Sequence, residues 1–149
     1  EARDSALVCL ALDGSELGRL VEELTSRGVS VRMMARGGSM SPWIRDGDVV
    51  TVTQRPARVG DVVGFRREGT GRLTMHRVVR RAPGGWVVRG DRAEREDGVL
   101  PRESVLGVVT HLEREGQTRL LPRGRVGIWL AHASRFALET RTWWRSTRK

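Results

Sequence analysis

Apolar residues recur at two spacings along the chain, and the change of spacing separates helical from β segments. Leu17, Leu20, Val21 and Leu24 lie three or four residues apart. This spacing predicts an amphipathic helix over roughly residues 14–27.

Both ends of this helix carry ordinary signals. Asp13 is followed three residues later by Glu16, as in a capping box, and Gly28 is a natural helix stop. The apolar run over residues 5–12 precedes it as a strand or a helix start. Cys9, the single cysteine, lies in that run and is expected to be a buried small hydrophobe.

After Gly28 the chain has the character of β structure, with Val- and Thr-rich segments separated by Gly, Pro and Asp. A polar loop is expected over residues 91–98, and the last two strands should form a hairpin around Glu115 and Gly116. The expected strands cover residues 29–35, 48–54, 61–68, 72–82, 86–91, 104–113 and 117–122.

Helical spacing returns at the end of the chain. A helix packed on the β core is the favoured interpretation, because most amphipathic stripes face a core. The alternative is a helix lying on an anionic membrane surface, with tryptophan at the headgroups and arginine outward. The expected stripe is Val126, Trp129, Leu130, Ala133, Phe136, Ala137, Thr140 and Trp144. The fold class predicted is α+β, with a mostly antiparallel β core, an N-terminal helix and a C-terminal amphipathic helix.

The chain is basic, with 27 Lys and Arg against 18 Asp and Glu and a formal net charge of +9. Such a balance suits nucleic acid, an anionic membrane or acidic peptides, but the charges are spread along the chain and favour a solvated arginine-rich surface. No apolar run is long enough to span a membrane, and no signal peptide is recognisable. Three distant histidines and one cysteine have no metal-ligand spacing, so no metal or cofactor is expected.

The most informative segment is GGSMSPWIRDGDVVTV, residues 37–52. Gly37 and Gly38 allow a tight, exposed turn before Ser39, and Pro42 restrains the chain after it. A serine on such a turn can reach a substrate carbonyl and offer its own N–H to the developing oxyanion.

A serine hydroxyl needs a base that removes its proton. Of the three histidines, His76 lies in the expected strand LTMHRVVRR, 37 residues after Ser39. His111 and His132 have no comparable setting. A lone strand histidine is more often structural, so the neighbouring motifs decide the interpretation.

Three segments in order, GGSMSPWIRDGDVV, HRVV and GWVVRGDRAERED, resemble the conserved boxes of signal peptidase I over roughly residues 36–110. This family belongs to the superfamily of signal peptidase/LexA-like serine peptidases. With a histidine at the base position, the chain resembles its archaeal and endoplasmic-reticulum branch. The resemblance implies Ser39 as nucleophile, His76 as base, and an aspartate at Asp97 that orients the histidine, with Asp91 supporting the site. It also implies that Gly38 and Met40 contact the substrate.

Two positions depart from the family pattern. Arg92 stands where an asparagine is usual, and Gly37 stands where bacterial members often have a hydroxyl donor. The oxyanion would then depend on the Ser39 N–H. Loss of one such donor typically costs about 10²–10³ in rate.

The function expected from this resemblance is a serine endopeptidase that cleaves signal or leader peptides, bound as extended strands. A non-catalytic peptide-binding relative and a self-cleaving regulator are the alternatives. Nucleic acid is not an expected partner, because no helix-turn-helix is recognisable. The chain would be cytoplasmic or peripherally membrane-associated through its C-terminal helix. The expected domains are residues 1–35, a helix and strand packing on the core; 36–122, the β catalytic domain; and 123–149, the basic helix.

Overall fold

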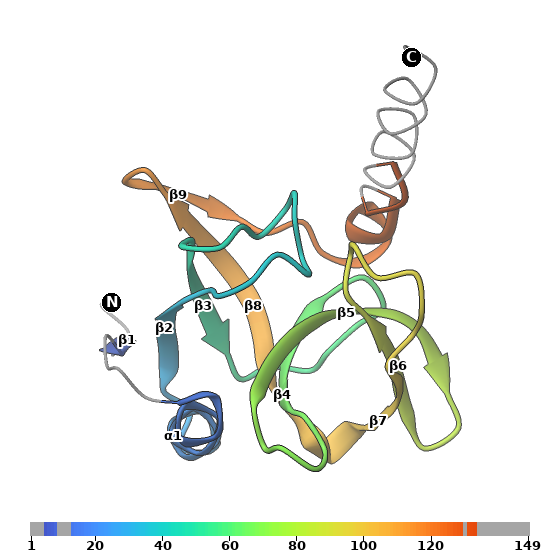
Figure 1. Cartoon of the computed structure of the whole chain (residues 1–149), viewed down its shortest axis with the longest axis horizontal. Helices are drawn as coiled ribbons and strands as arrows, with labels where there is room; N and C mark the ends of the chain where they lie inside the picture. The colour runs from blue at the N-terminus through green and yellow to red at the C-terminus, as the bar shows by residue number, and fades with distance from the viewer. Residues whose placement is uncertain (1–4, 9–12, 130, 134–149) are drawn as a thin grey trace, which may run out of the picture.

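The computed structural model describes residues 5–8, 13–129 and 131–133, which form one mostly antiparallel sheet with helices at its margins (Figure 1). The predicted α+β class with an antiparallel β core is confirmed. Its described helices include α1 (Gly14–Ser26) and the short 3₁₀ helix η1 (Arg102–Ser104). The strands are β1 (Ser5–Val8), β2 (Ser30–Met34), β3 (Val49–Thr53), β4 (Val62–Arg66), β5 (Leu73–Ala82), β6 (Gly85–Arg89), β7 (Gly98–Pro101), β8 (Val105–Arg114) and β9 (Gln117–Leu120).

The sheet order is β1-β2-β3-β8-β4-β5-β6-β7, with β9 pairing β8. The long strand β8 is central: it pairs with β3 along one edge and with β4 and β9 along the other. All pairs are antiparallel except β1 with β2. The expected boundary at residue 35 therefore falls after a strand that belongs to the same sheet as the rest.

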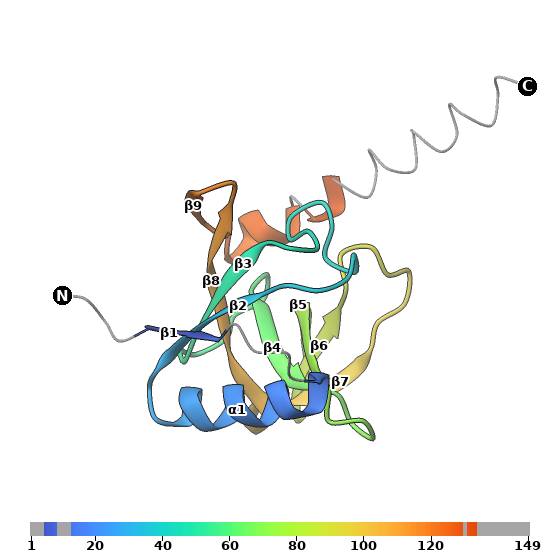
Figure 2. The same ribbon diagram turned by 60° about the vertical axis from the view of Figure 1, so that its left-hand side comes forward.

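Helix α1 begins as the sequence predicts. The Asp13 carboxylate accepts hydrogen bonds from the Ser15 and Glu16 amides at 2.8 and 2.9 Å, and the Glu16 side chain accepts one from the Asp13 amide. The hydrogen bonds that the Asp13 carboxylate accepts hold its pKa below the ordinary value, and the bond from the Glu16 amide has the largest effect. The helix buries Val21 completely and lies across one end of the curved sheet (Figure 2).

Two hydrophobic clusters fill the curved sheet. One lies under α1 and gathers Val31, Met33, Val50 and Val52 from β2 and β3. The other is built mainly on β4–β8 and includes Phe65, which is 5% exposed. Burying Val, Phe and Trp side chains of this kind stabilises a fold by about 1.5–3 kcal/mol each.

The expected strands are confirmed, but strand β7 was missed because its residues were assigned partly to a polar loop. β7 is a short edge strand in which Val99 is 54% exposed, so its sequence lacks the alternation of a half-buried strand.

The C-terminal helix starts at residue 124 and is described over 124–129 and 131–133. The predicted stripe is not its buried face there: Val126 and Trp129 are 60% and 67% exposed, whereas Ala131 is buried. A β-carbon on Gly127 would lie 2.7 Å from the Gly60 carbonyl oxygen. The helix therefore approaches the core through small residues, which a search for large apolar side chains overlooks.

The rest of that stripe, Leu130 and the residues from Phe136 on, lies outside the described residues, as does Cys9. Within the described part, no helix is long and apolar enough to cross a membrane.

Candidate active site

The segment that carries Ser39 is a loop between β2 and β3, closed at its base by backbone hydrogen bonds. The Ala35 amide donates to the Asp48 carbonyl at 2.7 Å, and the Gly47 amide donates to the Ala35 carbonyl at 2.8 Å. Gly37 has a φ of +84°, and its amide donates to the Asp46 carboxylate at 2.8 Å. A left-handed φ favours glycine, so this part of the predicted turn is confirmed.

Ser39 is exposed at the top of the loop, and Met40 directly after it is 4% exposed. Met40 packs into the cluster under α1, and its sulfur accepts the Asp91 amide at 3.4 Å. The Ser39 carbonyl accepts the Arg92 amide at 3.0 Å. A buried side chain and two contacts with the segment after β6 thus hold the serine in place.

The imidazole of His76 lies in β5, 6% exposed, with its edge against the Phe65 ring at a centroid distance of 6.1 Å. Nδ1 is hydrogen-bonded to a carboxylate oxygen of Asp97. A carboxylate accepts, so Nδ1 carries a proton, and in the neutral ring Nε2 is then the nitrogen with the lone pair.

Asp97 is positioned by its own backbone, since its amide donates to the Val88 carbonyl at 2.9 Å. Its side chain is 19% exposed, and its second oxygen lies 3.7 Å from Nη2 of Arg67. The structure therefore brings Asp97, rather than Asp91, to the histidine.

Asp91 has a different partner. Its carboxylate accepts Nε and Nη2 of Arg77 at 2.9 and 2.8 Å, and both side chains are 3% exposed. Arg77 also donates Nη1 to the Gly60 carbonyl at 2.8 Å. This buried pair fixes the segment that touches Ser39, so Asp91 supports the site through the fold. Arg77 follows His76 directly in HRVV, but nothing in that motif indicated its pairing with Asp91.

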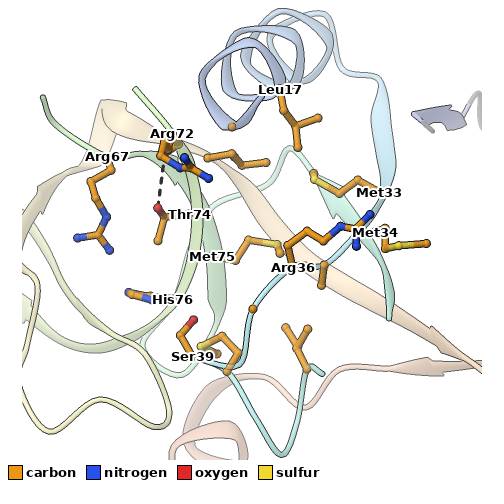
Figure 3. A pocket seen from close by; sticks show the side chains of 16 residues that line it. Leu17, Met33, Met34, Arg36, Ser39, Arg67, Arg72, Thr74, Met75 and His76 are labelled. Atoms are coloured by element: carbon orange, nitrogen blue, oxygen red, sulfur yellow. Dashed lines mark hydrogen bonds between the residues drawn. The ribbon is translucent and has the colours of Figure 1, made fainter. Parts of the chain in front are cut away.

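Ser39 and His76 both lie next to Gly90. A β-carbon built on Gly90 would lie 3.1 Å from His76 Nε2 and 3.1 Å from the Ser39 carbonyl oxygen, so these atoms are at most twice that distance apart. Figure 3 shows the Ser39 hydroxyl beside the ring. No hydrogen bond joins the Ser39 hydroxyl to His76 among the described contacts. Such bonds are often long in unliganded enzymes and shorten with substrate.

Both side chains line one cleft of about 470 Å³. Its walls come from β2 with the chain that follows it and from the first half of β5, and α1 closes its far end (Figure 3). Met40 lines the cleft, and Gly38 is not among the lining residues. The lining residues are Gly14, Leu17, Met33, Met34, Ala35, Arg36, Gly37, Ser39, Met40, Ile44, Arg67, Arg72, Leu73, Thr74, Met75 and His76.

Both walls have strand edges that pair with no other strand among the described residues. Residues 73–76 of β5 pair with β4, and the β5–β6 pairing begins only at Arg77. On the other wall, β1 pairs with β2 only as far as Met33 among the described strands. Unpaired backbone amides and carbonyls on two facing edges suit an extended peptide between them.

Backbone donors are available beside the serine. Among the described residues, no group accepts the amide hydrogens of Ser39 or Met40. Free amides next to a nucleophile can bind an oxyanion.

No cluster of His, Cys, Asp or Glu able to hold a metal occurs among the described residues. No protein family matches the chain, and comparison with curated proteins finds no similar sequence.

Proposed function

We propose that this chain is a serine endopeptidase that cleaves an extended peptide by acyl transfer, with Ser39 as nucleophile, His76 as general base and Asp97 as the residue that orients the base. The observation that carries the proposal is the hydrogen bond between His76 Nδ1 and Asp97, which leaves Nε2 free beside Ser39 in a shared cleft.

The proposed reaction begins when the Ser39 hydroxyl attacks the scissile carbonyl and its proton passes to His76 Nε2. The negative charge on the tetrahedral oxygen is stabilised by the free Ser39 amide, with the Met40 amide beside it. His76 then protonates the leaving amine. Water, deprotonated by the same nitrogen, hydrolyses the acyl-enzyme and regenerates Ser39.

Asp97 acts through the imidazole. Its carboxylate fixes the tautomer in which Nε2 accepts a proton, and its charge stabilises the imidazolium that forms. The edge contact with the Phe65 ring limits rotation of the imidazole. Removing a charged partner in such a triad costs about 10⁴ in kcat.

The fold supports a relationship to signal peptidase I. The three resembling segments are far apart in sequence, yet two of them supply the serine and the histidine to one cleft, and the third supplies the aspartate that is bonded to that histidine. We therefore infer a signal peptidase-like β core and a role in cleaving signal or leader peptides. Gly37 stands where bacterial members often have a hydroxyl donor, so backbone amides remain as the oxyanion donors.

The decisive experiment compares the parent with Ser39→Ala and His76→Ala on a defined mixture of synthetic peptides, with products identified by mass spectrometry. The parent should yield discrete cuts, and both variants should lose them by at least about 10³-fold. Arg55→Gln, an exposed change away from the cleft, serves as control. Equal cleavage by parent and both variants would refute the assignment.

A fluorophosphonate reagent separates an enzyme from a non-catalytic peptide-binding relative. Labelling of Ser39 requires an activated hydroxyl, so it should fall strongly in His76→Ala. Equal labelling of the two proteins would favour the binding module.

A further inference from the structure

We propose that the cleft selects peptides that carry an acidic residue within a few positions of the scissile bond, through Arg36, Arg67 and Arg72. The inference rests on the proposed peptidase function and adds its substrate class. It concerns the charges around the cleft, which play no part in the chemistry described above.

The three arginines line the cleft from both walls. Arg36 follows β2 on one side, and Arg67 and Arg72 flank the turn between β4 and β5 on the other (Figure 3). The Arg67 amide donates to the Arg72 carbonyl at 2.8 Å, so the two residues lie opposite each other where the β4–β5 turn begins and ends. Arg72 packs against α1, since its Nε lies 3.0 Å from where a Gly14 β-carbon would be.

In the described part of the chain, none of these arginines has a close carboxylate partner. Among the described residues, the guanidinium groups of Arg36 and Arg72 form no hydrogen bond or ion pair, and Arg67 has only its 3.7 Å contact with Asp97. Seven other arginines of the described chain pair closely with carboxylates: Arg27, Arg32, Arg66, Arg77, Arg80, Arg114 and Arg123. The cleft lining contains no Asp or Glu among its described residues.

The surroundings favour a peptide over other anions. The same cleft is lined by Met33, Met40 and Met75 and lies between two strand edges whose backbone groups have no strand partner among the described residues. An extended peptide satisfies those edges, buries small apolar side chains against the methionines and brings carboxylates to the arginines. A duplex or a bilayer cannot enter between two strand walls.

The spacing along β5 indicates where the acidic residue lies. Arg72 precedes His76 by four residues, which is roughly 13 Å along a strand. A carboxylate one to four residues from the scissile bond would therefore lie within reach of the arginines. Guanidinium groups bind carboxylates with two parallel hydrogen bonds, which a glutamine side chain cannot reproduce.

The test uses ten-residue peptides of Ala, Val and Ser with a central Ala–Ala pair. In each pair of peptides, one position carries Glu in one member and Gln in the other, and this position is moved through the four residues on either side of the Ala–Ala pair. Binding is measured by fluorescence anisotropy on Ser39→Ala, so the result does not depend on turnover. Cleavage of the Gln peptides by the parent reports separately on the proposed peptidase. The measurements are repeated with Arg36→Gln and Arg72→Gln combined, and with Arg55→Gln as a control that removes one charge outside the cleft.

We expect at least one Glu peptide to bind about three- to tenfold tighter than its Gln partner at low ionic strength, with the ratio falling as salt rises. The ratio should approach one in the cleft double variant and stay unchanged in Arg55→Gln. Equal binding of every Glu and Gln pair would overturn the proposal. So would a preference that survives in the double variant, or cleft-dependent binding of duplex DNA or anionic vesicles without a Glu preference.

Discussion

Gly90 offers a sharp test of the proposed site, because a single methyl group there would meet both reacting partners. In Gly90→Ala the new β-carbon would lie 3.1 Å from His76 Nε2, 3.4 Å from its Cδ2 and 3.1 Å from the Ser39 carbonyl oxygen. Favourable contacts of carbon with such atoms lie at roughly 3.5–4.0 Å. The ring and the serine loop must therefore move apart by a few tenths of an ångström.

This displacement acts on the proton-transfer path. A misplacement of about 1 Å can cost about 10²-fold in rate, so we expect kcat to fall by roughly 10–10²-fold, or about 1.4–2.7 kcal/mol of barrier. Overpacking of this size destabilises a fold by about 1–3 kcal/mol. The loss of activity should therefore persist at temperatures where circular dichroism shows the variant fully folded.

The assay measures the second-order rate of fluorophosphonate labelling of Ser39 together with cleavage of the best peptide from the mixture. Gly64→Ala is the matched control, since a β-carbon at this buried strand glycine meets only contacts of 3.9 Å. A folded Gly90→Ala protein that retains labelling and cleavage within twofold of the parent would refute the proposed proximity of Ser39 and His76.

Three further predictions follow from the ionic contacts. Asp97→Asn should lower kcat by about 10²–10⁴-fold with little change in stability, because the amide no longer fixes the His76 tautomer; unchanged kinetics would show that the carboxylate does not orient the base. Asp91→Ala should lower the free energy of unfolding by about 3 kcal/mol in urea titrations, because it leaves the buried Arg77 guanidinium unpaired; a loss under 1 kcal/mol would contradict the buried pairing. Hydrogen bonds from Arg114 hold the pKa of Asp48 below its ordinary 3.8. The Asp48–Arg114 pair therefore stabilises the fold fully above that pH, and this stabilisation is lost as the pH falls through the lowered pKa. Asp48→Asn should therefore cost about 2 kcal/mol near pH 6 and progressively less below pH 3.8, and a pH-independent difference would be inconsistent with that pairing.

Local patterns predicted much of the fold because their causes are local. The capping pair Asp13 and Glu16 lies within one helical turn, and the Val- and Thr-rich segments carry their strand preference in their own side chains. The edge strand β7 and the buried face of the C-terminal helix were not predicted. An exposed edge and a glycine contact leave no periodic apolar signal.

What the sequence alone determined is the set of chemical groups: a serine on a glycine turn, a histidine in a strand and two aspartates in one polar segment. Only the tertiary structure decided that Asp97 holds His76 while Asp91 holds Arg77, because the two aspartates are six residues apart and the turn after β6 sends them to different sides of β5. The open arginines of the cleft were equally hidden. A sequence counts charges, whereas the folded chain determines which of them find a carboxylate within reach.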